Sequence, residues 1–511
     1  VKLSLLFYFL SGSSSTSNST KRIATMAKTQ AKAKAEAAKM ASTSLWKREQ
    51  GWDKISAAEQ REVEAFCRQY MDFLSLAKTE RLAHDRCLEL AKKAGYRDLE
   101  AVKSSGGRLQ AGDKVYRSWR GKTLVLLQVG RDSLESGLAM VGAHIDAPRL
   151  DAKPYPLYQD DSLVLLDTHY YGGIKKYQWV AIPLALHGVV IRRDGTSVTL
   201  NIGEDPADPV FTITDLLPHL GAEQAEKPLG KAFSGEALNV LIASRPVDKK
   251  NDDKEVSDKT KLRVLQLLRD KYGLEEEDFF SAELEVVPAG PARDLGLDRS
   301  MVLGYGHDDR VCAYGAVRAL LEAGGVPRRT RLAVVCDKEE IGSYGATGMD
   351  SRIIENTVAE LVALTEPGAG ELAVRRALER SRMLSADVCA LHDPGYGDVS
   401  SPNNMAKVNC GVGVSKYSGA RGKSGASDAS AEFMGEVRRI FNDAGVIWQT
   451  CELGKVDVGG GGTIALYLAR YGMDVVDCGV GLFSMHAPWE VAGKLDIYMA
   501  FKAYRAFFEA E

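Results

Sequence analysis

The sequence predicts an α/β protein in which helices flank a mostly parallel sheet and a β-rich domain is inserted into the chain. From about residue 291 onward, short apolar runs alternate with amphipathic segments, as in repeated β-α units. Residues 151–290 instead show short alternating runs punctuated by Gly, Asp and Pro, which is typical of hairpins. Several apolar runs end in histidine or acidic residues, and open α/β sheets bind ligands at the carboxyl ends of their strands.

Composition narrows the functions open to the chain. Its 511 residues suggest two or three domains. The net charge of −3 indicates no nucleic-acid partner, and no apolar run reaches the roughly 18 residues needed to span a bilayer. The eight cysteines are scattered without a CxxC pair, which favours free thiols and a reducing, cytoplasmic compartment.

Residues 1–45 are predicted to be a flexible leader that carries no chemistry. The chain begins with Val1, and the apolar run over residues 3–10 is similar to a signal peptide. The first methionine is Met26. We therefore favour a translated upstream region before a start at Met26 or Met40, with secretion as the alternative.

The two parts of the α/β domain are expected on either side of the insertion. Residues 46–150 form the first part, and residues 291–511 form the second, after the β-rich domain of residues 151–290. Apolar periodicity predicts helices at residues 46–103, 311–323, 371–382, 428–444, 463–471 and 495–511, and strands at 123–130, 138–145, 331–336, 446–451 and 474–480.

The strand at 331–336 runs into two adjacent carboxylates, Glu339 and Glu340. Neighbouring glutamates at a strand tip repel each other, and the arrangement is costly unless cations or a shared proton offset the charge. A metal site is one solution. A solvated acidic turn is the other, because charged pairs usually lie on the surface.

Four further stretches place metal-ligand chemistry at the ends of predicted elements. They contain His144 with Asp146, Asp308 in GYGHDDR, Asp387 in LSADV, and His486 in FSMHAP. Singly, each has an ordinary explanation as a cap, a turn residue or a hydrogen-bonded histidine. Together they supply the imidazoles and carboxylates that two hydrolytic divalent ions require.

The chain resembles the M18 metallo-aminopeptidases, which include aspartyl aminopeptidases, and is similar to their bacterial-type members. The resemblance covers roughly residues 46–511 and rests on stretches that occur in family order. They are GAHIDAPRLD, HYYGGIKKYQWVAIPLALHG, GHDDR, CDKEEIGSYGATGM, LSADV, GKSGASDASAEF, VDVGGGGT and SMHAPWE.

The resemblance implies two divalent metal ions, most readily Zn²⁺ with Mn²⁺ or Co²⁺ as alternatives. It implies that His144, Asp308 and Asp387 bind one ion, that Asp308, Glu340 and His486 bind the other, and that Asp308 bridges them. Glu339 is the implied general base, and Asp146 would orient His144.

Other implied roles lie further along the chain. His187 is similar to a histidine that reaches a neighbouring subunit's site, and a hydrogen-bonded strand histidine is its alternative. Gly461 and Gly462 are candidates to line the substrate pocket, or else form a tight turn. Lys416 and Lys423 are candidates to bind an acidic side chain, although their spacing departs from the aspartyl-specific pattern.

The implied activity is removal of the first residue from peptides with a free N-terminus, by a metal-activated water. A dinuclear-metal carboxypeptidase or amide deacylase, and a catalytically idle assembly subunit, are the alternatives. The family also implies a homo-oligomer, commonly a dodecamer. The preferred first residue is left open.

Overall fold

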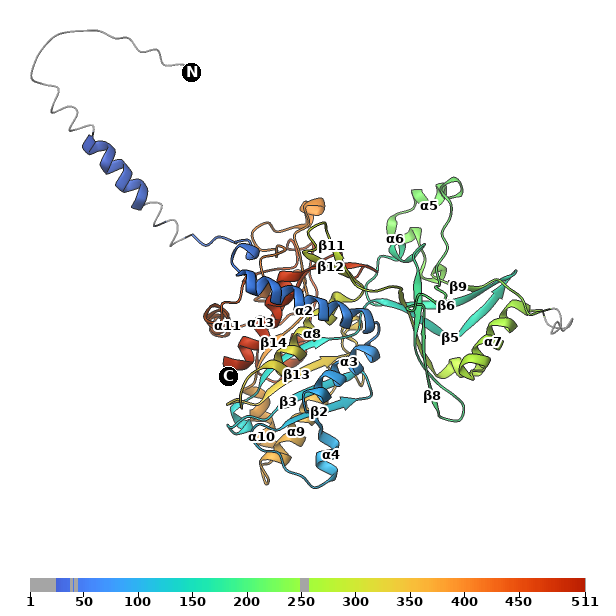
Figure 1. Cartoon of the computed structure of the whole chain (residues 1–511), viewed down its shortest axis with the longest axis horizontal. Coiled ribbons are helices and arrows are strands. Elements are labelled where there is room, and N and C mark those ends of the chain that lie inside the picture. The colour runs from blue at the N-terminus through green and yellow to red at the C-terminus, as the bar shows by residue number, and fades with distance from the viewer. Residues whose placement is uncertain (1–23, 37–39, 41–44, 249–256, 511) are drawn as a thin grey trace, which may run out of the picture. The chain divides into compact units, whose positions relative to one another are not determined.

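The computed structural model describes residues 24–36, 40, 45–248 and 257–510 (Figure 1). Residues 50–511 form one unit and residues 1–49 another. The predicted leader lies partly outside the described residues, and within it residues 24–36 are helical. None of the described helices combines the length and apolar character that crossing a bilayer demands.

A nine-stranded sheet forms the centre of the larger unit. Five of its eight neighbouring strand pairs are parallel among the described residues, so the predicted mostly parallel α/β fold is confirmed. In spatial order its strands are β1 (Arg97–Asp98), β2 (Lys114–Trp119), β3 (Thr123–Gln128), β13 (Arg331–Cys336), β4 (Ala139–His144), β14 (Arg382–Ser385), β18 (Asp474–Gly479), β16 (Val412–Ser415) and β17 (Trp448–Thr450).

Helices cover both faces of this sheet because its strands are apolar on both sides. In β13, Ala333 and Val335 belong to one buried cluster, while Leu332 and Val334 belong to the other. The first cluster includes buried residues of α2 (Ala57–Leu76), α3 (Glu80–Lys93), α8 (His307–Glu322), α11 (Ala431–Asp443) and α13 (Lys494–Ala510). The second includes α4 (Leu99–Ser104), α9 (Ile353–Thr365), α10 (Glu371–Glu379) and α12 (Ala465–Ala469).

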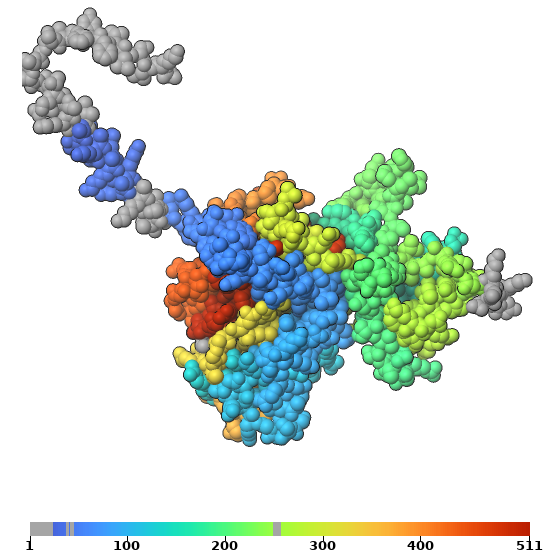
Figure 2. Space-filling model, viewed as in Figure 1, coloured from blue at the N-terminus to red at the C-terminus, as the bar shows by residue number. Residues whose placement is uncertain are grey.

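The middle of the chain forms a separate antiparallel sheet with its own buried cluster, visible as the green lobe in Figure 2. It also contains α7 (Lys259–Tyr272), which packs on β5 and β6. Its strands, in spatial order, are β8 (Ser197–Ile202), β7 (Leu184–Ile191), β10 (Ala282–Pro288), β5 (Arg149–Asp160), β6 (Leu163–Tyr171) and β9 (Val240–Ala243).

A third sheet among the described residues was not predicted from the sequence pattern. Its strands are short and come from distant parts of the chain. In order they are β11 (Arg293–Leu295), β12 (Met301–Gly304), β20 (Glu490–Gly493), β19 (Gly481–Phe483) and β15 (Cys389–Ala390). Strand β12 leads into α8, and the β19–β20 connection carries His486. This sheet therefore positions two of the predicted site segments.

Candidate active site

Three neighbouring parallel strands, β13, β4 and β14, end at the same edge of the large sheet. Their register places Cys336 opposite His144. Glu339 and Glu340 follow β13 in a short 3-10 turn, and Asp387 lies two residues beyond β14. Residues separated by more than 200 positions in sequence thus meet because parallel strands share a carboxyl end.

Asp308 lies between two imidazoles. Its Oδ1 is 3.2 Å from Nε2 of His144, and its Oδ2 is 3.2 Å from Nε2 of His486. The same Nε2 of His486 is 3.4 Å from Oε2 of Glu340. Asp308 sits at the start of α8, where its φ and ψ are non-helical, so its carboxylate is placed by the turn that leads into the helix.

Asp146 connects His144 to the turn that carries Glu339 and Glu340. Its Oδ1 accepts a hydrogen bond from the backbone N–H of Glu339 at 3.1 Å and lies 3.2 Å from Nδ1 of His144. Its Oδ2 accepts from the backbone N–H of Glu340 at 3.2 Å and from the Tyr171 hydroxyl at 2.8 Å. The histidine is therefore held with Nε2 facing the carboxylates, as expected for a metal-binding imidazole.

Glu490 is a site residue that the sequence interpretation missed. It is 1% exposed. Its Oε1 accepts from the backbone N–H of His486 at 2.7 Å, and its Oε2 accepts from that of Asp308 at 3.1 Å. One side chain therefore positions two predicted ligands. The only signal in the sequence is its place four residues after His486, in MHAPWE.

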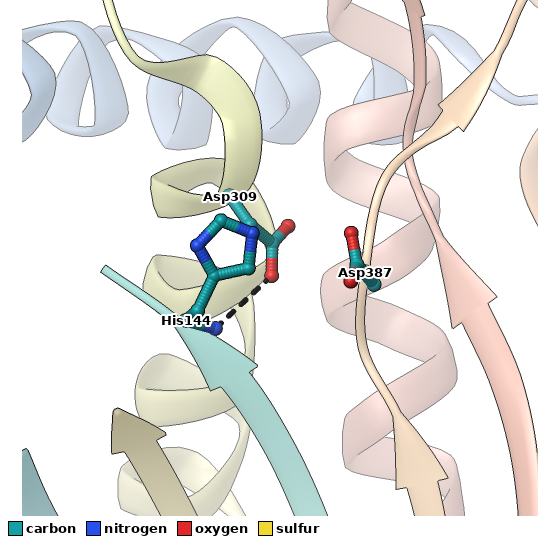
Figure 3. Close-up of side chains that lie close together, drawn as sticks. All are labelled: His144, Asp309 and Asp387. Atoms are coloured by element: carbon teal, nitrogen blue, oxygen red, sulfur yellow. Dashed lines mark hydrogen bonds between the residues drawn. The ribbon is translucent and has the colours of Figure 1, made fainter. Parts of the chain in front are cut away.

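Asp309 is the second residue that was missed. Its side chain converges with those of His144 and Asp387, and the three residues come from separate parts of the chain (Figure 3). The Asp309 Oδ2 also accepts a hydrogen bond from the His144 backbone N–H at 3.3 Å. The sequence offered a signal, because Asp309 directly follows Asp308 in GHDDR.

The donor set fits divalent metal ions. Two groups have ligand atoms within 4.8 Å of one another: His144, Asp309 and Asp387, and His144, Asp308 and Glu340. Within them, Oε1 of Glu340 and Oδ1 of Asp309 are buried without a hydrogen-bond partner. A buried carboxylate oxygen without a partner is costly, and a bound cation would offset that cost.

Burial and crowding change the proton affinity of the site. Burial raises the pKa of the Glu339 carboxyl to about 7, and raises those of Glu340 and Asp387 well above their usual range. Burial lowers the pKa of His486, but its hydrogen bond to Asp308 and the negative charges of Glu340 and Asp308 together outweigh this and bring the pKa to about 10. Without cations the cluster therefore retains protons, and binding a divalent ion would release them.

The site opens into a pocket of about 250 Å³. Gly461 and Gly462 line this pocket together with Glu339. Lys416 and Lys423 do not: both donate to the carboxylate of Asp428, at 2.5 and 3.0 Å. Lys423 lines a smaller neighbouring pocket instead.

His187 lies in β7, away from these groups. It is 1% exposed, and its Nε2 is 3.1 Å from Oε1 of Glu204. The other ring nitrogen, Nδ1, is buried without a hydrogen-bond partner. His187 does not line the 250 Å³ pocket of its own chain, and its action on a neighbouring subunit stays a prediction.

Comparison with known proteins identifies the family. Residues 73–508 match the model of the aminopeptidase I zinc metalloprotease family, M18. The chain belongs to the M18 family. A probable M18 family aminopeptidase 1 of Clostridium acetobutylicum is 50% identical over 456 residues, which are 89% of this chain and 97% of the relative. This confirms the resemblance, and with it the prediction of a metallo-aminopeptidase.

Solved structures of M18 aminopeptidases share the whole fold. That from Thermotoga maritima has a TM-score of 0.86 and 42% identity, covering 91% of this chain and all of the other. Aminopeptidase I from Clostridium acetobutylicum has a TM-score of 0.84 and 47% identity, covering 91% of this chain and 99% of the other. The fold of this chain is therefore that of the M18 aminopeptidases.

Proposed function

We propose that this M18 aminopeptidase binds two divalent ions and uses Glu339 as a general base to release the first residue of a peptide. The observation that carries the proposal is Asp308, whose two oxygens each lie 3.2 Å from an imidazole Nε2. A carboxylate placed symmetrically in this way suits a bridge between two ions. The proposed ligands are His144, Asp308, Glu340, Asp387 and His486. This combination of imidazoles and carboxylates suits Zn²⁺, and Mn²⁺ or Co²⁺ could replace it.

Each residue of the proposed site would have a separate role in the reaction. When bound, the ions would supply Lewis acidity to the scissile carbonyl and the attacking water. Glu339 would take a proton from that water at its carboxylate and deliver it to the leaving nitrogen. Asp146 would keep His144 in one tautomer through Nδ1, and Glu490 would hold the backbone that presents Asp308 and His486.

The 250 Å³ pocket supports a proposal about the first residue. Its lining is rich in carboxylates, which would attract a positively charged α-amine and so favour cleavage next to a free N-terminus. No Lys or Arg is among its described lining residues, and buried Asp477 lines it. We therefore expect uncharged first residues to be favoured over Asp or Glu. The competing prediction is that Lys416 or Lys423 binds the side chain of an acidic first residue, which would favour Asp or Glu.

Assembly and location belong to the same proposal. We propose that residues 151–290 form a domain for subunit contacts and that the protein is a homo-oligomer, with twelve copies as the expected number. A solved structure described as an mApe1 dodecamer has a similar fold, at a TM-score of 0.71. Cys67, Cys87, Cys312, Cys336, Cys389 and Cys478 are buried thiols outside any disulfide, which supports a reducing, cytoplasmic location.

Initial rates on dipeptides that differ only in the first residue test the function. Leu, Ala, Lys, Asp and Glu would each be followed by a constant second residue, with Zn²⁺, Mn²⁺ or Co²⁺ and with a chelator. We expect metal-dependent cleavage with Leu or Ala ahead of Asp, and none after acetylation of the α-amine. Preference for Asp would support the two lysines, and activity indifferent to chelator would contradict the metal mechanism.

A further inference from the structure

A second and larger pocket adjoins the site on the other side of His486. Its volume is about 560 Å³, within the range of sites that enclose small ligands. Two residues, Met485 and His486, line both this pocket and the 250 Å³ pocket that contains Glu339. The proposed reaction centre therefore lies where two cavities meet.

The two cavities differ in chemistry. The smaller one is lined by four acidic side chains of the proposed site: Asp308, Glu339, Glu340 and Asp387. The larger one contains none of these. Its walls carry Tyr177, Tyr396, Leu482 and Phe483, with one cation, Lys175, and one carboxylate, Asp393. It is thus an aromatic and apolar cavity without a dominant charge.

Three separate segments build the larger cavity. Tyr177 comes from the 3-10 turn that follows the insertion's strand β6, Tyr396 from the turn after β15, and Phe483 from the end of β19. Tyr177 is 38% exposed and Tyr396 is 72% exposed, so both rings are accessible to a chain that enters the cavity.

We infer that the larger cavity binds the part of a peptide that follows the cleaved bond, and that it favours apolar or aromatic second and third residues. This inference rests on the proposed function. Hydrolysis breaks the C–N bond, adds the hydroxyl of water to the carbonyl carbon and leaves a proton on the departing amine. The released amine carries the rest of the chain, and the cavity beyond His486 is the aromatic space into which that chain extends.

Specificity constants for tripeptides with one first residue and varied second residues test the inference. With Leu first and Gly last, we expect kcat/KM to be about ten-fold higher for Leu or Phe in the second position than for Gly or Asp. The Tyr177→Ala and Tyr396→Ala variants should each reduce this ratio several-fold. Tyr155→Ala, at a tyrosine that is 57% exposed and lines no described pocket, should leave it unchanged.

The outcomes separate this inference from the function on which it rests. If no peptide is cleaved with any metal, the proposed function fails. If peptides are cleaved but the ratio is near one, or both cavity variants keep the ratio of the parent, the inference is overturned while the function stands. Because the readout is a ratio for each variant, a general loss of active protein does not imitate the expected result.

Discussion

Glu339 is the residue on which the proposed chemistry depends most directly, because its carboxylate lies 3.9 Å from His144 Nε2 and lines the reaction pocket. Glu339→Gln keeps the size of the side chain but removes its ability to accept a proton. We expect kcat to fall by about 10²- to 10⁴-fold. The bound zinc measured by atomic absorption should not change.

The control for this variant is Glu371→Gln, at an exposed glutamate on α10. It should match the parent in both rate and metal content. A Glu339→Gln enzyme as active as the parent would exclude a general-base role. Loss of zinc together with activity would instead make Glu339 a metal ligand.

Tyr171 gives a second prediction, about positioning. Its hydroxyl donates to Asp146, while its ring lies 3.8 Å from the guanidinium of Arg149. Tyr171→Phe removes the hydrogen bond and keeps the ring contact. We expect zinc affinity to fall several-fold, which is less than the roughly 10- to 100-fold typical for direct partners of metal-bound histidines, because Tyr171 acts on His144 through Asp146. Chelator competition would measure the affinity. Tyr170→Phe, at the neighbouring and half-exposed tyrosine, should show no change.

Among the secondary-structure elements, β18 constrains the segment that follows β14. A Cβ added at Gly479, the last residue of β18, would lie 1.7 Å from the carbonyl oxygen of Asp387. Gly479→Ala must therefore displace the backbone of a proposed ligand. We expect a loss of about 1–3 kcal/mol in the free energy of unfolding, together with weaker zinc binding.

Thermal unfolding and chelator competition would measure both effects of this change. Gly435→Ala is the matched control. It lies in α11 with no atom within 4 Å of the added Cβ, so it should be neutral or slightly stabilising. If Gly479→Ala behaves like this control, β18 does not position Asp387.

For the whole molecule, metal binding and folding should be linked, because the site brings together buried acidic residues from the parts of the α/β domain before and after the insertion. Ions that bind only the folded state would stabilise it by about 4 kcal/mol at a thousand times their Kd. We expect chelation to lower the melting temperature by several degrees and added Zn²⁺ to restore it. An unchanged melting temperature would contradict a resident metal.

The inserted sheet also contributes to the site of its own chain. Tyr171, at the end of β6, donates to Asp146, and the carbonyl oxygen of Gly173 lies 2.9 Å from His486 Nδ1. Both imidazoles are therefore oriented with the help of one short segment of the insertion. This intrachain role stands beside the proposed role of the insertion in subunit contacts.

The predictable part of the molecule consisted of local patterns. The all-apolar run of β13 indicated a strand buried on both faces, and the glutamates after it indicated a strand-end site. The family motifs then pointed to the proposed ligands. The apolar periodicity of the sequence did not reveal α9 or the five-stranded sheet. The strands of this sheet span only two to four residues, which is too short for a periodic pattern to be recognised.

By itself, the sequence determined which side chains follow which strands, and hence the α/β class and the candidate ligands at the strand ends. Only the tertiary structure decided that β4 lies between β13 and β14, that Glu490 accepts hydrogen bonds from the backbone of two proposed ligands, and that Asp309 joins the cluster. The physical reason is that these relations depend on pairing between strands and on hydrogen bonds between residues far apart in the chain. Local periodicity carries no information about such long-range contacts.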